Sequence, residues 1–132
     1  MTKATGRFEV TLTPQAAEEQ IAAAQLGRML IDKTFVGDLT ATSNGQMVAA
    51  MGAVEGSAGY VAMERVSGTL HGRSGTFVLQ HSSTMHRGTP QQSITVVPDS
   101  GTDELAGLRG QMVIDIVDGE HFYTFDYVLE GA

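Results

Sequence analysis

Residues 112–125 read Met-Val-Ile-Asp-Ile-Val-Asp-Gly-Glu-His-Phe-Tyr-Thr-Phe. The central Asp118-Gly119 pair is typical of a two-residue type I′ turn, because both central residues of that turn need a positive φ. Pairing Val117 with Glu120 across this turn sets the register of two antiparallel strands. The cross-strand pairs are then Ile116 with His121, Ile114 with Tyr123, and Met112 with Phe125, and all six side chains share one face. Turn chemistry and hydrophobic pattern therefore predict the same β-hairpin.

A second hairpin is predicted from residues 59–81. Its first strand alternates, and the more apolar face, placed inward, carries Tyr60, Ala62, Glu64, Val66, Gly68 and Leu70. After a turn within residues 71–74, the inward side chains are Phe77, Leu79 and His81. A turn centred on Gly72-Arg73 places His81 directly opposite Glu64, and one centred on Arg73-Ser74 places the two diagonally.

The remaining chain adds enough strands for a closed sheet. Further strands are expected at Arg7–Leu12, Leu26–Phe35, Asp38–Gly52 and Gln92–Val97, and sixteen glycines mark many of the breaks. About eight strands favour one all-β domain spanning residues 1–132, an antiparallel barrel that leaves no exposed edge. A two-sheet sandwich fits the pattern nearly as well. Pro14–Ala24, with Thr13 as N-cap, is expected to form a short surface helix or a loop.

Composition narrows the function classes. The 132 residues have a net charge of −7, no concentrated basic patch and no cysteine. Nucleic acid and anionic membrane surfaces are therefore unexpected partners, and disulfides and thiolate sites are excluded. Neither a secretory signal nor a spanning segment is visible, so a cytoplasmic location is expected. The histidines lack metal-site spacing and no phosphate or dinucleotide motif occurs, so we expect no metal and no cofactor.

Three segments carry a family resemblance. They are Lys33–Leu39, Gly56–His81, and Val97–Gly110 with His121–Tyr127. Together they resemble the bacterial family called domain of unknown function 3224. The run from Ser100 to Gly110 is also similar to the Gly-Thr-Gly…Gly-x-x-Gly turn of allene oxide cyclases and dirigent proteins, although Asp103 replaces a glycine. The resemblance implies an eight-stranded antiparallel barrel and little about function.

Glu64 and His81 are the candidate catalytic residues. A carboxyl group in a dry interior has a raised pKa unless it is paired, and such a group can act as an acid or a base. Histidine titrates near neutrality and can also move protons. The alternative for Glu64 is a structural role with an internal partner, and the alternative for His81 is a solvent-facing position at the barrel mouth.

Aromatic and polar side chains on the inward faces are the candidate ligand contacts. They are Tyr60, Phe77, His121, Tyr123, Phe125 and Tyr127, although a plain core would use the tyrosines equally well. The leading hypothesis is a barrel that binds a small hydrophobic or aromatic molecule in its lumen. The alternatives are a cofactor-independent isomerase or cyclase using Glu64 or His81, and an interaction protein with a filled core. An apolar outer strip on the last hairpin (Val113, Val117, Phe122, Val128) suggests a homo-oligomer.

Overall fold

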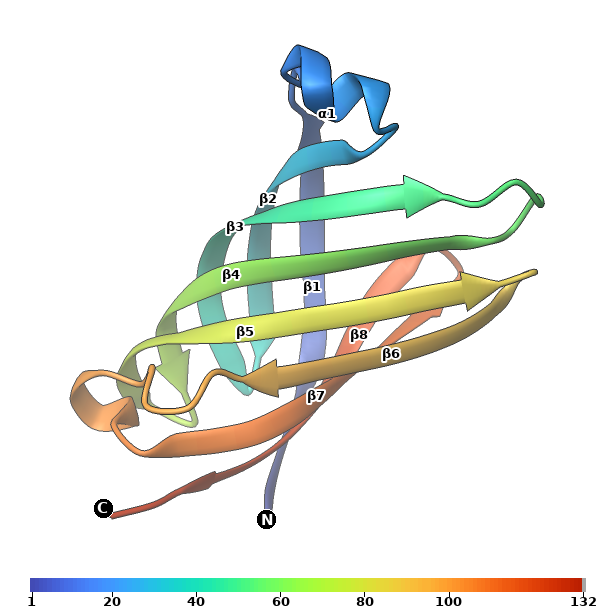
Figure 1. Ribbon diagram of the computed structural model, residues 1–132. Coiled ribbons are helices and arrows are strands. Elements are labelled where there is room, and N and C mark those ends of the chain that lie inside the picture. Colours follow the sequence, from blue (N-terminus) through green and yellow to red (C-terminus); the bar gives the residue numbers. More distant parts are fainter. Residues whose placement is uncertain (132) are drawn as a thin grey trace.

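The computed structural model describes residues 1–131, which form eight strands, one short α-helix and one 3₁₀ turn (Figure 1). The strands are β1 (Thr2–Pro14), β2 (Gly27–Gly37), β3 (Leu39–Met51), β4 (Ala58–Leu70), β5 (Arg73–His86), β6 (Thr89–Val96), β7 (Leu108–Val117) and β8 (Glu120–Leu129). Each strand pairs antiparallel with the next, and β8 returns to β1. The predicted eight-stranded antiparallel barrel is therefore confirmed, and the sandwich is excluded.

The structure confirms the predicted register of one hairpin and corrects that of the other. The β7–β8 register is as predicted, with Val117 opposite Glu120 and Asp118 and Gly119 both at positive φ. The β4–β5 turn is centred on His71-Gly72 instead, because these two residues adopt the positive φ values of 47° and 80°. Both predicted turn centres were wrong. His81 consequently pairs with Ala62 and lies diagonal to Glu64.

The short helix is confirmed, but its predicted start was wrong. Helix α1 covers only Glu19–Ala23, and its N-cap is Glu18. Thr13 and Pro14 belong to β1, which pairs with β2 as far as the Pro14–Met29 pair. Tertiary pairing extends the strand through a sequence that locally favours a helix start.

One half of the barrel interior is filled with apolar side chains. The ring of Phe77 stacks on that of Phe125 at 5.8 Å, and the ring of Phe35 meets Tyr123 edge-on at 5.7 Å. Leu105 of the 3₁₀ turn η1 (Asp103–Leu105) is buried in the same cluster. This filled half lies toward the chain termini and η1, at the lower left of Figure 1.

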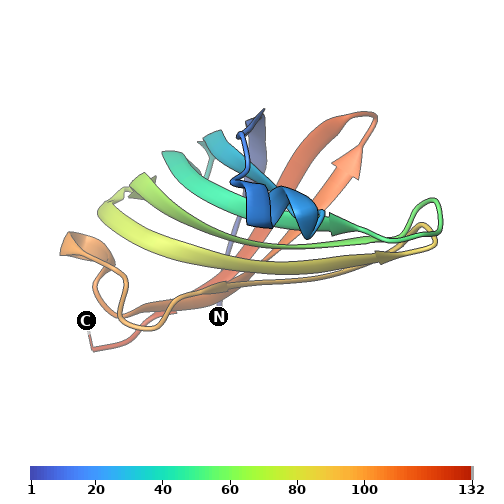
Figure 2. The same cartoon turned by 45° about the horizontal axis from the view of Figure 1, so that its top comes forward.

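The other half of the barrel wall is incompletely paired. The β1–β8 ladder ends at the Phe8–His121 pair, and β6 pairs with β7 only through Ile94–Met112 and Thr95–Gln111. The side-chain amide of Gln92 bridges the second gap, because it donates to the carbonyl of Ile114 and accepts from its N–H. The tip of the β7–β8 hairpin therefore diverges from β3–β6, as Figure 2 shows. We call this half, on the side of α1, the open end.

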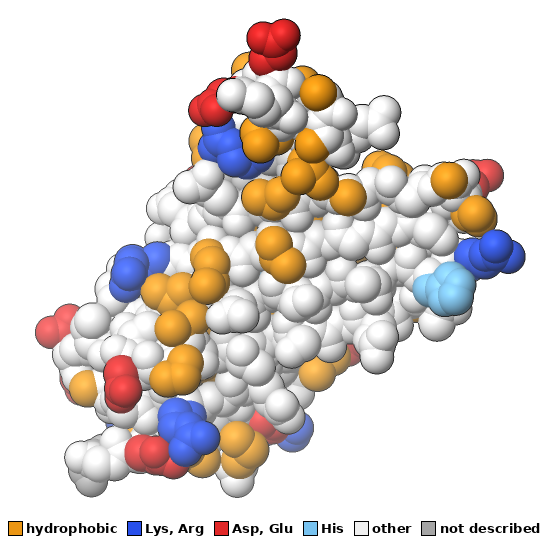
Figure 3. All heavy atoms as spheres, viewed as in Figure 1, with side chains coloured by type: hydrophobic (Ala, Val, Ile, Leu, Met, Phe, Trp, Pro, Cys, Tyr) orange, Lys and Arg blue, Asp and Glu red, His pale blue; other side chains and the backbone are white. Residues whose placement is uncertain are grey.

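The outer surface exposes both hydrophobic and charged side chains. On the face seen in Figure 3, hydrophobic side chains gather beneath α1 and over the strands below it, while charged side chains lie mainly at the edges. Exposed hydrophobic residues on the outer sides of β2–β4 include Leu30, Val48, Val61 and Met63. None of the helices in residues 1–131 has the length and apolar character needed to cross a membrane.

Candidate functional site

Four polar side chains meet inside the barrel, one from each of four neighbouring strands. They are Lys33 of β2, Ser43 of β3, Glu64 of β4 and His81 of β5, and all are buried. Lys33 Nζ donates to Glu64 Oε2 at 2.8 Å, and Ser43 Oγ donates to Glu64 Oε1 at 2.9 Å. His81 Nε2 lies 2.7 Å from Glu64 Oε2. We call this group the buried polar layer. The two predicted catalytic residues are therefore in contact.

Glu64 is held as a carboxylate. Burial alone would raise its pKa, but the approach of His81 and the charge of Lys33 outweigh burial and lower the pKa to about 2. This direction is opposite to the one expected for an unpaired carboxyl group. Glu64 is therefore a poor general base near neutral pH, and its carboxylate organises the cations and hydroxyl around it.

His81 has one ring nitrogen in a close but irregular contact. Its side chain is only 4% exposed, and Nε2 makes no hydrogen bond of regular geometry to the described protein atoms. The 2.7 Å approach of Nε2 to Glu64 Oε2 therefore lacks the geometry of a regular hydrogen bond. A carboxylate beside Nε2 favours the tautomer that carries its proton on that nitrogen.

Lys33 and Ser43 were missed by the sequence analysis. Lys33 Nζ sits 4.8 Å from the centre of the Phe8 ring, so the cation has an aromatic face as well as a carboxylate. The alternation Ile31, Lys33, Phe35 along β2 would have placed Lys33 inward, because both of its apolar neighbours are buried.

A glycine makes room for Glu64. Gly45 pairs directly with Glu64, and a Cβ at position 45 would lie 2.7 Å from Glu64 Cα and still closer to the Met63 carbonyl oxygen. A glycine inside a strand marks such close backbone approach. A glycine at position 45 in the sequence therefore indicates that the backbones of β3 and β4 lie unusually close at this point.

The open end lies next to the buried polar layer. Tyr60 and His121, both predicted ligand contacts, are half-buried on its inner wall. Burial raises the pKa of Tyr60 despite its hydrogen bond with Ser83, and the charge of Glu64 raises it further. The His121 ring lies 5.1 Å from Phe8, whose ring also faces Lys33. Further inward-facing apolar side chains at this end include Val10, Leu12, Met29, Met47, Ile114 and Ile116, and all six are half-buried or exposed.

The other four predicted ligand contacts lie in the filled half. Phe77 and Phe125 pack against each other, and both are fully buried. The Tyr123 hydroxyl accepts from the Leu39 N–H at 2.9 Å and donates to the Val36 carbonyl at 2.9 Å. Burial raises the Tyr123 pKa, although the Leu39 N–H opposes that shift. The structure thus separates these residues from Tyr60 and His121.

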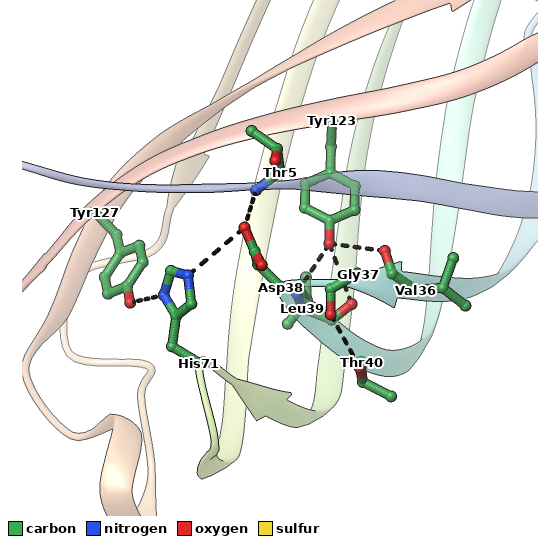
Figure 4. Close-up of polar contacts among 9 residues, drawn as sticks. All are labelled: Thr5, Val36, Gly37, Asp38, Leu39, Thr40, His71, Tyr123 and Tyr127. Atoms are coloured by element: carbon green, nitrogen blue, oxygen red, sulfur yellow. Dashed lines mark hydrogen bonds and ion pairs between the residues drawn. The ribbon is translucent and has the colours of Figure 1, made fainter.

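Tyr127 belongs to a polar network at the filled end (Figure 4). Its hydroxyl contacts His71 Nδ1, and His71 Nε2 lies 3.6 Å from Asp38 Oδ2. Asp38 Oδ2 also accepts from the Thr5 N–H at 2.9 Å. Burial raises the pKa of Tyr127. The charge of Arg73 lowers this pKa, and the charge of Asp38 raises it further. These contacts join β8, two turns and β1, so they fasten the end of the barrel.

Among residues 1–131, no three His, Asp or Glu side chains come together as a group that could hold a metal ion. A cleft of about 430 Å³ lies where β1 leaves β8, and Phe8, Val10, Gly119, Glu120 and His121 are among its lining residues.

Comparison with known proteins agrees with this architecture. A crystal structure of a protein of unknown function from the DUF3224 family of Shewanella oneidensis MR-1 is 52% identical to this chain, with a TM-score of 0.94. The match covers 100% of this chain and 99% of that one. Curated proteins give no match, and the predicted relation to allene oxide cyclases stays a prediction. The model of the family "Protein of unknown function (DUF3224)" matches residues 4–127, and the chain therefore belongs to this family.

Proposed function

We propose that the open end binds a small hydrophobic or aromatic molecule against the buried polar layer. The observation that carries this proposal is the contrast between the two halves of one barrel interior. In the filled half the inward side chains are sealed against each other, whereas at the open end Leu12 and Ile116 remain 45% and 65% exposed. Inward apolar side chains left in contact with water are typical of a surface that a ligand covers.

The cost of the buried polar layer supports the same proposal. Removing a carboxylate and an ammonium group from water costs several kcal/mol per ion, and hydrophobic replacements are often as stable or more stable. Lys33 and Glu64 nevertheless occupy the centre of the barrel. Their position beside the open end gives a bound molecule a polar surface to orient against, in addition to apolar walls.

The proposal is tested by filling the open end. Met47 points inward and is half-buried, while the adjacent Val48 points outward and is 41% exposed. We would screen small apolar and aromatic metabolites by thermal shift against wild type, Met47→Trp and Val48→Trp. We expect compounds that stabilise wild type and Val48→Trp but not Met47→Trp, because an indole ring in the open end occupies their place.

Two results would count against the proposal. Stabilisation that survives in Met47→Trp would place the ligand elsewhere. The absence of any stabilising compound would favour the third hypothesis, a protein whose interior serves structure or partner binding. Circular dichroism of both tryptophan variants checks that they remain folded.

A second candidate function is proton transfer within the bound molecule, as in a cofactor-independent isomerase. It is favoured by the contact between His81 and a carboxylate that stays ionised. His81 would take a proton from a carbon beside a carbonyl group and return it to another carbon, while Lys33 stabilises the charge on the oxygen. Deuterium exchange into 2-tetralone, followed by NMR, should be faster with wild type and with His86→Gln than with His81→Gln. Equal exchange rates with all three proteins would remove this function.

A further inference from the structure

We infer that the free edge of β1 is a dimerisation site, at which a second copy of this chain adds its own β1 in antiparallel pairing. The site is the segment Glu9–Pro14, which follows the last β1–β8 pair. This inference concerns a partner; it shares Leu12 with the open end but does not depend on the proposed ligand.

The hydrogen-bonding direction along β1 identifies the free groups. In an antiparallel ladder each residue points its N–H and C=O to the same side, and the side alternates along the strand. The Thr5 carbonyl accepts from Asp38 N–H, and Gln15 N–H donates to the Arg28 carbonyl, so odd-numbered residues point toward β2. The peptide groups of Val10 and Leu12 therefore point to the side where β8 has already ended. Such an edge is a template for another strand.

The space beside this edge suits an added strand. The cleft of about 430 Å³ lies beside β1 and the tip of the β7–β8 hairpin, with Val10 and Gly119 among its lining residues, and it extends over Thr34 and Val36 of β2. A neighbouring strand needs about 4.8 Å of separation. The hairpin tip diverges from β3–β6 (Figure 2), and β8 begins at Glu120, one residue beyond the last β1–β8 pair.

The segment is complementary to itself. A two-fold axis at Thr11 places Val10 opposite Leu12 of the second copy, and Leu12 opposite its Val10. Both are then hydrogen-bonded pairs, because these are the residues whose peptide groups face outward. Glu9 falls opposite a threonine, Thr13, so no like charges meet, and Thr11 faces Thr11, a favourable cross-strand pair. The same pairing covers the exposed Leu12 side chain with a valine.

The free edge can be blocked without removing a hydrogen bond between β1 and β2. Proline at position 10 removes an N–H that β2 does not use, and edge strands tolerate proline at such positions. A second variant, Leu12→Lys, places a charge on the edge and removes the apolar contact. The control Val48→Lys changes an outward residue away from the edge, and Val117→Lys changes the apolar strip on the hairpin.

Sedimentation velocity over a wide concentration range tests the inference. We expect wild type, Val48→Lys and Val117→Lys to shift from the 14.0 kDa monomer to twice that mass as concentration rises. Val10→Pro and Leu12→Lys should stay monomeric. If Val10→Pro does not fold, Leu12→Lys alone tests the inference. A wild type that is monomeric throughout would overturn the inference. So would a dimer that both edge variants retain, or one that Val117→Lys abolishes.

Discussion

Replacing Glu64 with glutamine should destabilise the barrel more than any exposed charge change. Glu64 is 1% exposed, and its two oxygens contact Lys33, Ser43 and His81. Glutamine keeps the shape but leaves the Lys33 ammonium buried without a counter-charge. Removing one partner of a buried ion pair costs about 3–5 kcal/mol.

The loss is large relative to the stability of a domain of this size. Natural domains unfold at a cost of about 5–15 kcal/mol. For a chain of 132 residues, a loss of 3–5 kcal/mol lowers the Tm by about 10–20 °C. Urea unfolding at neutral pH measures it directly as a change in midpoint with an unchanged slope. Glu55→Gln, at an exposed position, is the matched control and should stay within about 0.5 kcal/mol of wild type.

A double variant separates the charge from the packing. Lys33→Met with Glu64→Leu removes both charges and keeps apolar volume, so it should be more stable than Glu64→Gln alone. If Glu64→Gln unfolds within about 1 kcal/mol of wild type, water or rearrangement compensates the lone ammonium and the reasoning from the buried ion pair fails.

Three further predictions follow from single contacts. Because the pKa of Glu64 is about 2 in the folded protein against an ordinary 4.5, its contribution is fully present above pH 4.5 and is lost as the pH falls toward 2. Acid titration of stability should show a loss of about 3 kcal/mol in wild type that is missing in Glu64→Gln, and parallel curves would contradict the assignment. Tyr123→Phe removes the hydroxyl that joins Val36 and Leu39, and should cost about 1–2 kcal/mol in urea unfolding. Gly45→Ala forces a Cβ against the backbone of β4 and should cost about 3 kcal/mol. Gly72→Ala, with φ +80° and open space around it, should cost only about 1 kcal/mol, and equal losses at positions 45 and 72 would refute the steric argument.

The sequence by itself determined the local geometry of strands and their inward faces. Asp118-Gly119 specified both turn type and register, because few dipeptides accept two positive φ values. Alternation placed Glu64, Phe77 and His81 inward, since the side-chain period of a strand is two residues. The centre of the turn after Leu70 was predicted one or two residues too late, because a histidine at positive φ gives no strong local signal in the sequence.

Tertiary structure alone decided which inward residues meet. The pairing of β2 and β4 with β3 brings Lys33, 31 residues from Glu64, into contact with it, and His81 and Lys33 together turn an expected rise in pKa into a fall. Barrel closure also divides the aromatic candidates, sealing Phe77 and Phe125 in one half while Tyr60 and His121 border the open end. The length of β1 was equally invisible, since β8 begins at Glu120 while pairing with β2 carries β1 as far as Pro14. Local pattern specifies a strand and its faces, but which strands adjoin and how far they pair depends on the whole barrel.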